Sequence, residues 1–121
     1  MGLFSRLLGV RDEPPAPEDP DDVVLRAMRD AGADLARETE TRFYLYFPTA
    51  GHAHSAANVA SREGYLTEVR EPPEGYDTWL CLVTQQMTPS RDAIKAVRAR
   101  LEELARSLDG EFDGWEAAVA R

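Results

Sequence analysis

The sequence lacks the residues from which disulfide bonds and metal-thiolate clusters are built. Its only cysteine is Cys81, which lies in the apolar run TWLCLV. A single cysteine cannot form an intramolecular disulfide, and a cluster of thiolate ligands is excluded. We therefore interpret Cys81 as a core residue and expect a reducing, cytoplasmic environment for the protein.

Long apolar runs and a cleavable signal pattern are also missing. The purely apolar stretches span only a few residues, whereas a helix that crosses a bilayer needs about twenty. The 121 residues predict one soluble domain, which is large enough to bury about two-thirds of the surface that its unfolded chain exposes. Such a domain needs neither a disulfide nor a metal ion to fold.

Positive charge is scarce as well. The chain has 14 basic and 22 acidic residues, which give a net charge of −8, and only one of the basic residues is a lysine. Proteins that bind nucleic acids draw much of their affinity from Lys and Arg, because these displace counterions from phosphates. The composition therefore disfavours direct binding of nucleic acid. It favours a basic partner, such as a protein that itself binds nucleic acid.

The chain divides into an N-terminal segment, residues 1–20, and a folded domain, residues 21–121. Within MGLFSRLLGV the large apolar residues share one side of a short helix: Leu3, Phe4, Leu7 and Leu8. Several interpretations are open for residues 2–9: contact with a membrane, contact with a partner, or simply a frayed chain end or a helix that rests on the domain itself. The acidic, proline-rich run RDEPPAPEDP then predicts an extended linker.

Apolar patterns of two periods follow one another along the domain. The run TRFYLYFP alternates with a period of two, as strands do, and the residues 90–108 carry the apolar stripe of an amphipathic helix. In full, the patterns predict helices over residues 21–32, 49–64 and 90–108, and strands over residues 41–48, 65–71, 78–87 and 111–119. From residue 41 onward this order is the split β-α-β arrangement of ferredoxin-like α+β folds.

This arrangement predicts a four-stranded antiparallel sheet with the first and third strands in the middle and the two later helices on one face. Tyr44 and Tyr46 are expected on the other face, together with either the Trp79 and Cys81 side of the third strand or its alternate. The extra N-terminal helix is free to cover part of this face with an apolar stripe. The stripe consists of Val23, Val24, Ala27, Met28 and Ala31.

Polar residues and glycines predict where the elements begin and end. The expected N-caps are Asp21 or Asp22 for the first helix, Thr49 for the second and Ser90 for the third. Gly110 is expected to take a positive φ after the last helix. Gly114 is expected to form a bulge within the last strand, because a hairpin there would leave its first arm too short.

The basic residues of the last predicted helix are interpreted as a solvent-exposed face. Arg91, Lys95, Arg98 and Arg106 run beside its apolar stripe, with glutamates between them. Such a run usually forms a solvated face. We therefore expect it to point to water.

Candidates for catalysis or metal binding are weak. His52 and His54 stand two residues apart on a predicted helix, so they point about 200 degrees away from each other and cannot share a metal ion. The carboxylates of DGEFDGWE, residues 109–116, do not match the spacing of a calcium loop. The glycines form no phosphate-binding loop. We predict a protein without catalytic activity, metal ion or cofactor.

The segment DGEFDGWE is instead the candidate partner-binding site. Phe112 and Trp115 are hypothesised to anchor the last strand, and the carboxylates beside them form an acidic patch. The candidate site residues are Tyr44, Tyr46, Asp109, Glu111, Asp113, Trp115 and Glu116.

The alternative is a module that binds single-stranded RNA by stacking bases on Tyr44 and Tyr46. That function needs basic residues around the aromatic rings. The sheet segments carry two arginines against two glutamates, so their electrostatics are neutral at best.

Several stretches resemble one known family. They are DLARETETRFYLYFPT, the alanine-rich helix that ends in EGY, the strand with QQMTPS, and LDGEFDGWE. Over residues 22–119 the chain resembles the regulator of ribonuclease activity B family, and FYLYFP and EFDGWE are the most specific parts. The resemblance implies a ferredoxin-like fold, no cofactor, and a non-catalytic protein that binds ribonuclease E and restrains its cutting of RNA. The expected partner is thus an endoribonuclease of the ribonuclease E type.

Overall fold

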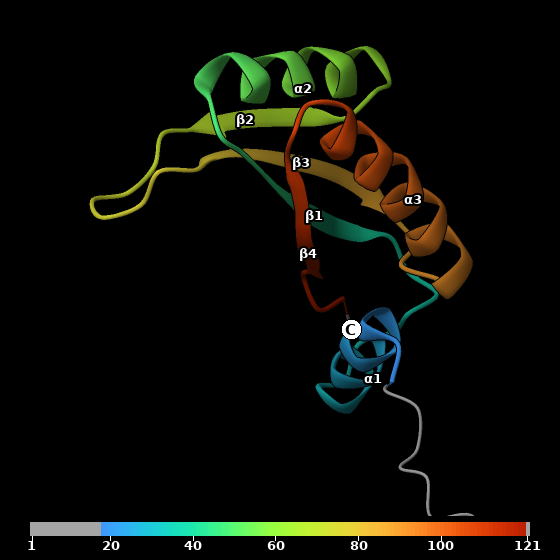
Figure 1. The fold of residues 1–121 in the computed structure, drawn as a ribbon. Coiled ribbons are helices and arrows are strands. Elements are labelled where there is room, and N and C mark those ends of the chain that lie inside the picture. Colours follow the sequence, from blue (N-terminus) through green and yellow to red (C-terminus); the bar gives the residue numbers. More distant parts are fainter. Residues whose placement is uncertain (1–17, 121) are drawn as a thin grey trace, which may run out of the picture.

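The structure is a computed structural model that describes residues 18–120. Three helices and four strands follow one another in this part of the chain (Figure 1). The helices are α1 (Pro20–Asp30), α2 (Ala50–Arg62) and α3 (Arg91–Ser107), and the strands are β1 (Thr39–Phe47), β2 (Leu66–Arg70), β3 (Trp79–Met87) and β4 (Glu111–Ala117). None of these helices is both long and apolar enough to span a bilayer. The apolar segment predicted at residues 2–9 lies outside the described residues.

The four strands form one antiparallel sheet in the order β2-β3-β1-β4. The first and third strands are therefore central, as the sequence predicts, and the short, charged β2 lies at an edge. β1 pairs with β3 along its whole length, from Thr39 opposite Met87 to Phe47 opposite Trp79. This α+β architecture confirms the predicted fold class and is compatible with a ferredoxin-like arrangement.

The two faces of the sheet differ. α2 and α3 both cover one face, where the core lies (Figure 1). Phe43, Leu45 and Phe47 of β1 point into this core, and none of them is exposed. The intervening Tyr44 and Tyr46 lie on the opposite face, because successive side chains of a strand alternate. We call this opposite face the open face.

The pairing with β1 shows which side chains of β3 lie on the open face, a point that the sequence leaves open. Leu80 lies opposite Tyr46, so Leu80 and Leu82 belong to the open face. Trp79 and Cys81 take the other side of the strand and join the core. The open face therefore holds leucines beside its tyrosines.

The helix caps are partly as expected. The hydroxyls of Thr49 and Ser90 each accept a backbone N–H from the first turn of the following helix, at 3.1 Å in both cases. The N-cap of α1 is Asp19, whose Oδ1 accepts the N–H of Asp21 at 2.9 Å. The prediction of Asp21 or Asp22 was wrong, because Pro20 fits the first helical position and lets the helix begin earlier.

In the turn between α3 and β4, Gly110 is required because a side chain there would clash with β1, and not because of a positive φ. Asp109 takes the left-handed conformation, with φ 60°. The expectation that Gly110 would do so was wrong. A Cβ on Gly110 would lie 2.4 Å from Cδ1 of Phe47 and 2.5 Å from the carbonyl oxygen of Tyr46. Asp tolerates the left-handed region, whereas only glycine fits against β1 here.

A bulge in β4 is confirmed at Gly114, which has φ 107°. Trp115 lies opposite Phe43 and Phe112 lies opposite Leu45, so two residues of β4 face the single residue between them on β1. Positions three apart on a regular strand point to opposite faces. The extra residue therefore turns Phe112 and Trp115 to the same, core side.

α1 packs against α3. Its Leu25 and Met28 enter the core, whereas Val23 is 42 % exposed and Ala27 is exposed too. The predicted apolar stripe is therefore rotated from the face that is buried. α1 reaches the open face only near Val24, which lines a groove beside β4 together with Tyr44 and Tyr46, so it covers a small part of that face. The orientation of α1 follows from ion pairs with α3, which are described below.

Candidate functional site

Three of the four carboxylates of the candidate site lie on β4. Glu111, Asp113 and Glu116 are all exposed there. Glu111 pairs with Tyr46 across the strands, and Glu116 bonds to Tyr44, so these groups meet on the open face. We call these five residues the β4 acidic surface.

Tyr44 is held in place within this surface. Its hydroxyl donates a 2.9 Å hydrogen bond to Oε2 of Glu116. Burial and this hydrogen bond to a carboxylate raise the pKa of Tyr44. Nη1 of Arg42 lies 3.7 Å from the same carboxylate oxygen. The ring of Tyr44 is therefore neutral and oriented by its neighbours.

The bulge leaves a groove along β4. A groove of about 320 Å³ runs past Gly114, which has no side chain to fill it. Its lining includes Val24 of α1 as well as residues of the sheet. It brings together five of the seven candidate residues: Tyr44, Tyr46, Asp113, Trp115 and Glu116. Glu111 adjoins this group through its pairing with Tyr46.

Asp109 stands apart from the other candidates. It lies in the turn before β4, and it lines neither the groove at Gly114 nor the other cavities described below. Its N–H donates to the carbonyl of Arg106 at 3.3 Å. Asp109 thus shapes the turn before β4 and takes no direct part in the β4 acidic surface.

Trp115 anchors β4 from the core side. It is 7 % exposed and packs with the buried residues of the sheet. The ring of Phe112, three residues earlier, lies 6.4 Å from the ring of Phe43, and the guanidinium carbon of Arg98 lies 5.2 Å from its centroid. The predicted anchoring by both aromatic residues is observed, and it holds the carboxylates of β4 toward solvent.

A buried carboxylate completes this anchor and was missed by the sequence reasoning. The side chain of Asp21 is 1 % exposed. Its Oδ1 accepts hydrogen bonds from Nε1 of Trp115 at 3.0 Å and from Nη1 of Arg98 at 2.6 Å. The spacing of Asp21 with Leu25 and Met28, at i, i+4 and i+7, was the available signal, because it places all three on one helix face.

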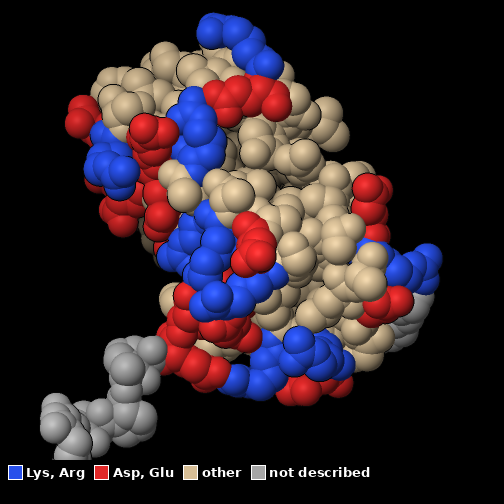
Figure 2. Space-filling model, turned by 90° about the vertical axis from the view of Figure 1, so that its right-hand side faces the viewer, with Lys and Arg blue, Asp and Glu red and all other residues tan. Residues whose placement is uncertain are grey.

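Basic residues of α3 also hold the first turn of α1 in place through ion pairs. Nε of Arg91 lies 2.8 Å from Oδ1 of Asp22, and Nζ of Lys95 bonds to a carboxylate oxygen of Asp19. The bond to Lys95 is the main reason why the pKa of Asp19 lies below its ordinary value. The prediction of a solvated face holds for Arg91, whose side chain is 56 % exposed, and is wrong for Arg98, which is 26 % exposed and bonds to the buried Asp21. Viewed from the side that carries α3 and α1, basic and acidic groups interleave (Figure 2).

The arginines on the strands of the open face are also engaged. Nε of Arg42 lies 2.8 Å from Oε2 of Glu40, and Nε of Arg70 lies 2.7 Å from Oε2 of Glu68. The bond to Arg70 lowers the pKa of Glu68. A phosphate backbone would meet carboxylates and occupied guanidinium groups on this face. Such a surface repels single-stranded RNA more than it attracts it.

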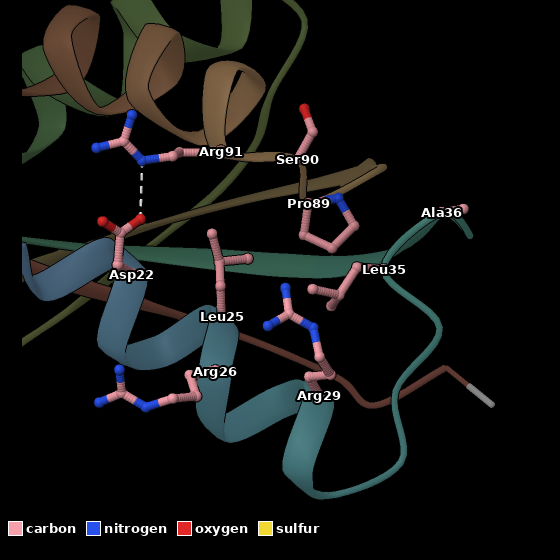
Figure 3. A pocket seen from close by; sticks show the side chains of 9 residues that line it. All are labelled: Asp22, Leu25, Arg26, Arg29, Leu35, Ala36, Pro89, Ser90 and Arg91. Atoms are coloured by element: carbon pink, nitrogen blue, oxygen red, sulfur yellow. Dashed lines mark hydrogen bonds and ion pairs between the residues drawn. The ribbon is translucent and has the colours of Figure 1, made fainter.

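A pocket of about 510 Å³ lies between α1, the loop after it and the start of α3 (Figure 3). It is lined by Asp22, Leu25, Arg26, Arg29, Leu35, Ala36, Pro89, Ser90 and Arg91. Arg91 bonds to Asp22, as the dashed line in Figure 3 shows, and Arg26 bonds to Glu18. Two of the three arginines are therefore neutralised within the protein. The pocket offers little net charge to a ligand.

The histidines and the cysteine form no site in the described part of the chain. His54 is exposed and His52 is partly buried, and residues 18–120 contain no group of three His, Cys, Asp or Glu placed to hold a metal ion. Cys81 is fully buried, and its burial raises the pKa of the thiol to about 11. This supports its interpretation as a core residue.

Comparison with protein families agrees with the motifs of the sequence. A family model described as regulator of ribonuclease activity B matches residues 18–117. The match spans every helix and strand from α1 to β4. Comparison with curated proteins gives no match.

Proposed function

The chain belongs to the regulator of ribonuclease activity B family, and we propose from this that it binds an endoribonuclease of the ribonuclease E type and restrains its cutting of RNA. In this proposal the chain catalyses no reaction and needs no cofactor. It acts by occupying a surface of the enzyme.

The β4 acidic surface is the proposed contact. Glu111, Asp113 and Glu116 are exposed beside two tyrosines on a sheet face that α2 and α3 leave uncovered. This observation carries the proposal, because proteins that bind RNA present basic surfaces, and such surfaces are complementary to these carboxylates. Tyrosines at half-buried positions add contact area with little loss of conformational entropy. Trp115 supports the surface from the core, whereas Asp109 stands in the turn before β4 and is not part of the proposed contact.

The test is a binding and cleavage assay with purified components. Full-length protein is titrated into an endoribonuclease of the ribonuclease E type, and both complex formation and the rate of cleavage of a single-stranded RNA are measured. We expect a complex, slower cleavage as the protein is added, and an association rate that falls as salt is raised. An unchanged cleavage rate together with no detectable complex would overturn the proposal.

Neutral variants test the surface itself. Replacing Glu111, Asp113 and Glu116 by their amides should weaken the complex about tenfold or more, since each loses a charge without a change of shape. Asp30→Asn with Glu103→Gln is the control, because both residues are exposed on the helices α1 and α3. Equal binding by the two sets of variants would remove the β4 acidic surface from the proposal.

Direct binding of RNA is the competing outcome of the same assay. A shift of RNA by the protein alone, lost on Tyr44→Ala or Tyr46→Ala, would favour an RNA-binding module. The engaged arginines of the open face argue against this result.

A further inference from the structure

A cavity of about 770 Å³ lies at one end of the open face, and we call it the end pocket. One row across the sheet forms its floor, since Arg70 pairs with Leu80, Leu80 with Tyr46, and Tyr46 with Glu111. The turn between β2 and β3 adds Tyr76 to the lining. Residues from all four strands and one turn therefore converge on this cavity.

Aromatic and apolar groups make up much of the end pocket. Tyr46 and Leu80 contribute from the sheet, and Pro73 and Tyr76 contribute from the turn. Tyr76 is 73 % exposed, so its ring contributes little to the core of the domain. A large aromatic side chain left in water beside a cavity is typical of a contact surface.

The polar lining of the end pocket is negative. Glu71, Glu111 and Asp113 line it, and none of them makes an ion pair with another described residue. Arg70 is the basic residue of the lining, but its guanidinium already bonds to Glu68 at 2.7 and 3.2 Å. Within residues 18–120 these three carboxylates thus have no ion-pair partner.

We propose that the end pocket binds an arginine side chain from a basic segment of the protein partner. The inference rests on the proposed function, which makes the partner a protein. A guanidinium can stack on a tyrosine ring while its N–H groups bond to carboxylates in the same plane. Arginine suits this combination better than lysine, because it is planar and more weakly hydrated. The cavity has room for the arginine and the backbone next to it.

A synthetic peptide tests the chemistry of the pocket without the ribonuclease. The probe is a glycine- and serine-rich peptide with two arginines, and its control has citrulline, the uncharged analogue of arginine, at both places. Binding to the full chain is measured by calorimetry, and the contacted residues are located by amide chemical shifts. We expect the arginine peptide to shift the amides of Tyr46, Tyr76 and Leu80, and the citrulline peptide to bind at least about tenfold more weakly.

Variants in the exposed lining sharpen the test. Tyr76→Ala should weaken binding of the arginine peptide roughly tenfold, whereas Tyr76→Phe keeps the ring and should retain it. Glu71→Gln with Asp113→Asn should also weaken binding. Asp77→Asn is the matched control, because this exposed carboxylate lies on the same turn but does not line the end pocket.

Failure of this inference and failure of the proposed function give different results. Equal binding of the two peptides, or shifts only outside the end pocket, would overturn the inference. A ribonuclease complex that is insensitive to Tyr76→Ala and to the Glu71 and Asp113 variants would also overturn it, and the proposed function would stand. Binding of the arginine peptide in the end pocket without any ribonuclease complex would support the pocket and overturn the proposed enzyme partner. Shifts of the same amides by a single-stranded oligonucleotide alone would overturn both.

Discussion

Nε1 of Trp115 donates a hydrogen bond of 3.0 Å to Oδ1 of Asp21, a residue 94 positions earlier in the chain. The Asp21 side chain is almost completely withdrawn from water, so its charge is tolerated only because indole, guanidinium and ammonium groups surround it. The bond joins α1 to β4. It therefore stabilises, from the core side, the strand that carries the β4 acidic surface.

Asp21→Ala should lower the free energy of unfolding by about 2–3 kcal/mol, because the buried N–H of Trp115 and the partly buried guanidinium of Arg98 lose their acceptor. Urea denaturation of the two proteins measures this difference. Asp22→Ala is the control, since its ion pair with Arg91 is at the surface and should contribute no more than about 1 kcal/mol. Equal losses of unfolding free energy in the two variants would show that the buried Asp21 stabilises the domain no more than a surface carboxylate does.

Trp115→Ala should cost about 3–5 kcal/mol, because it removes a buried ring that packs with the core and bonds to Asp21 of α1. A domain of marginal stability could unfold altogether. Trp115→Phe keeps a six-membered ring in the buried site but loses the five-membered ring that carries the N–H to Asp21, so its loss of stability should be smaller than that of the alanine variant. Thermal and urea unfolding distinguish the two. Stability unchanged in the alanine variant would mean that Trp115 is a surface group after all.

Gly110→Ala should destabilise the domain by about 1–3 kcal/mol, because the new Cβ would clash with the ring of Phe47 and with the backbone of β1. The matched control is Gly51→Ala in α2. There the nearest atom to a new Cβ is Oγ1 of Thr49 at 3.9 Å, and the helix should gain up to about 1 kcal/mol. Similar midpoints of urea unfolding for both variants would contradict the close approach at Gly110.

The docking of α1 should weaken in acid. The hydrogen bond from Lys95 keeps the pKa of Asp19 below its ordinary value of 3.8. A carboxylate with a lower pKa in the folded state stabilises that state above its unfolded pKa, and the contribution disappears as pH falls through the folded pKa. We therefore expect the unfolding free energy to decline as pH falls below about 4.

Asp19→Asn isolates this effect. Asparagine still caps the helix, so the N-cap bond to Asp21 is kept while the charge is lost. Urea denaturation at several pH values should show a shallower acid decline for Asp19→Asn than for the natural chain. Parallel declines would assign the acid sensitivity to other carboxylates.

Cys81 should be inert toward thiol reagents in the folded protein. It is fully buried, and its pKa is raised to about 11, so the thiolate is scarce and inaccessible near neutral pH. The rate of labelling should rise steeply when urea unfolds the domain. Because the sequence has no other cysteine, fast labelling without urea would directly contradict the buried position.

Much of the candidate site follows from local patterns. The alternation in TRFYLYFP predicts that Tyr44 and Tyr46 share a face away from the core, and the structure agrees. The bulge at Gly114 is also predicted from the sequence. The end pocket is not, because Tyr76 and Glu71 lie in a turn whose path depends on tertiary contacts and not on any period of the sequence.

The sequence alone determined the order of helices and strands, the central places of β1 and β3, and the negative charge of the chain. These properties follow from apolar periodicity and composition, which are local and need no knowledge of neighbours. Only the tertiary structure decided which side of β3 joins the open face, that Asp109 and not Gly110 takes the positive φ, and that Asp21 meets Trp115, Arg98 and Lys95. These three features depend on which helices and strands contact each other. Such contacts join segments far apart in the sequence, and a charge buried between them is stable only where donors from several elements surround it.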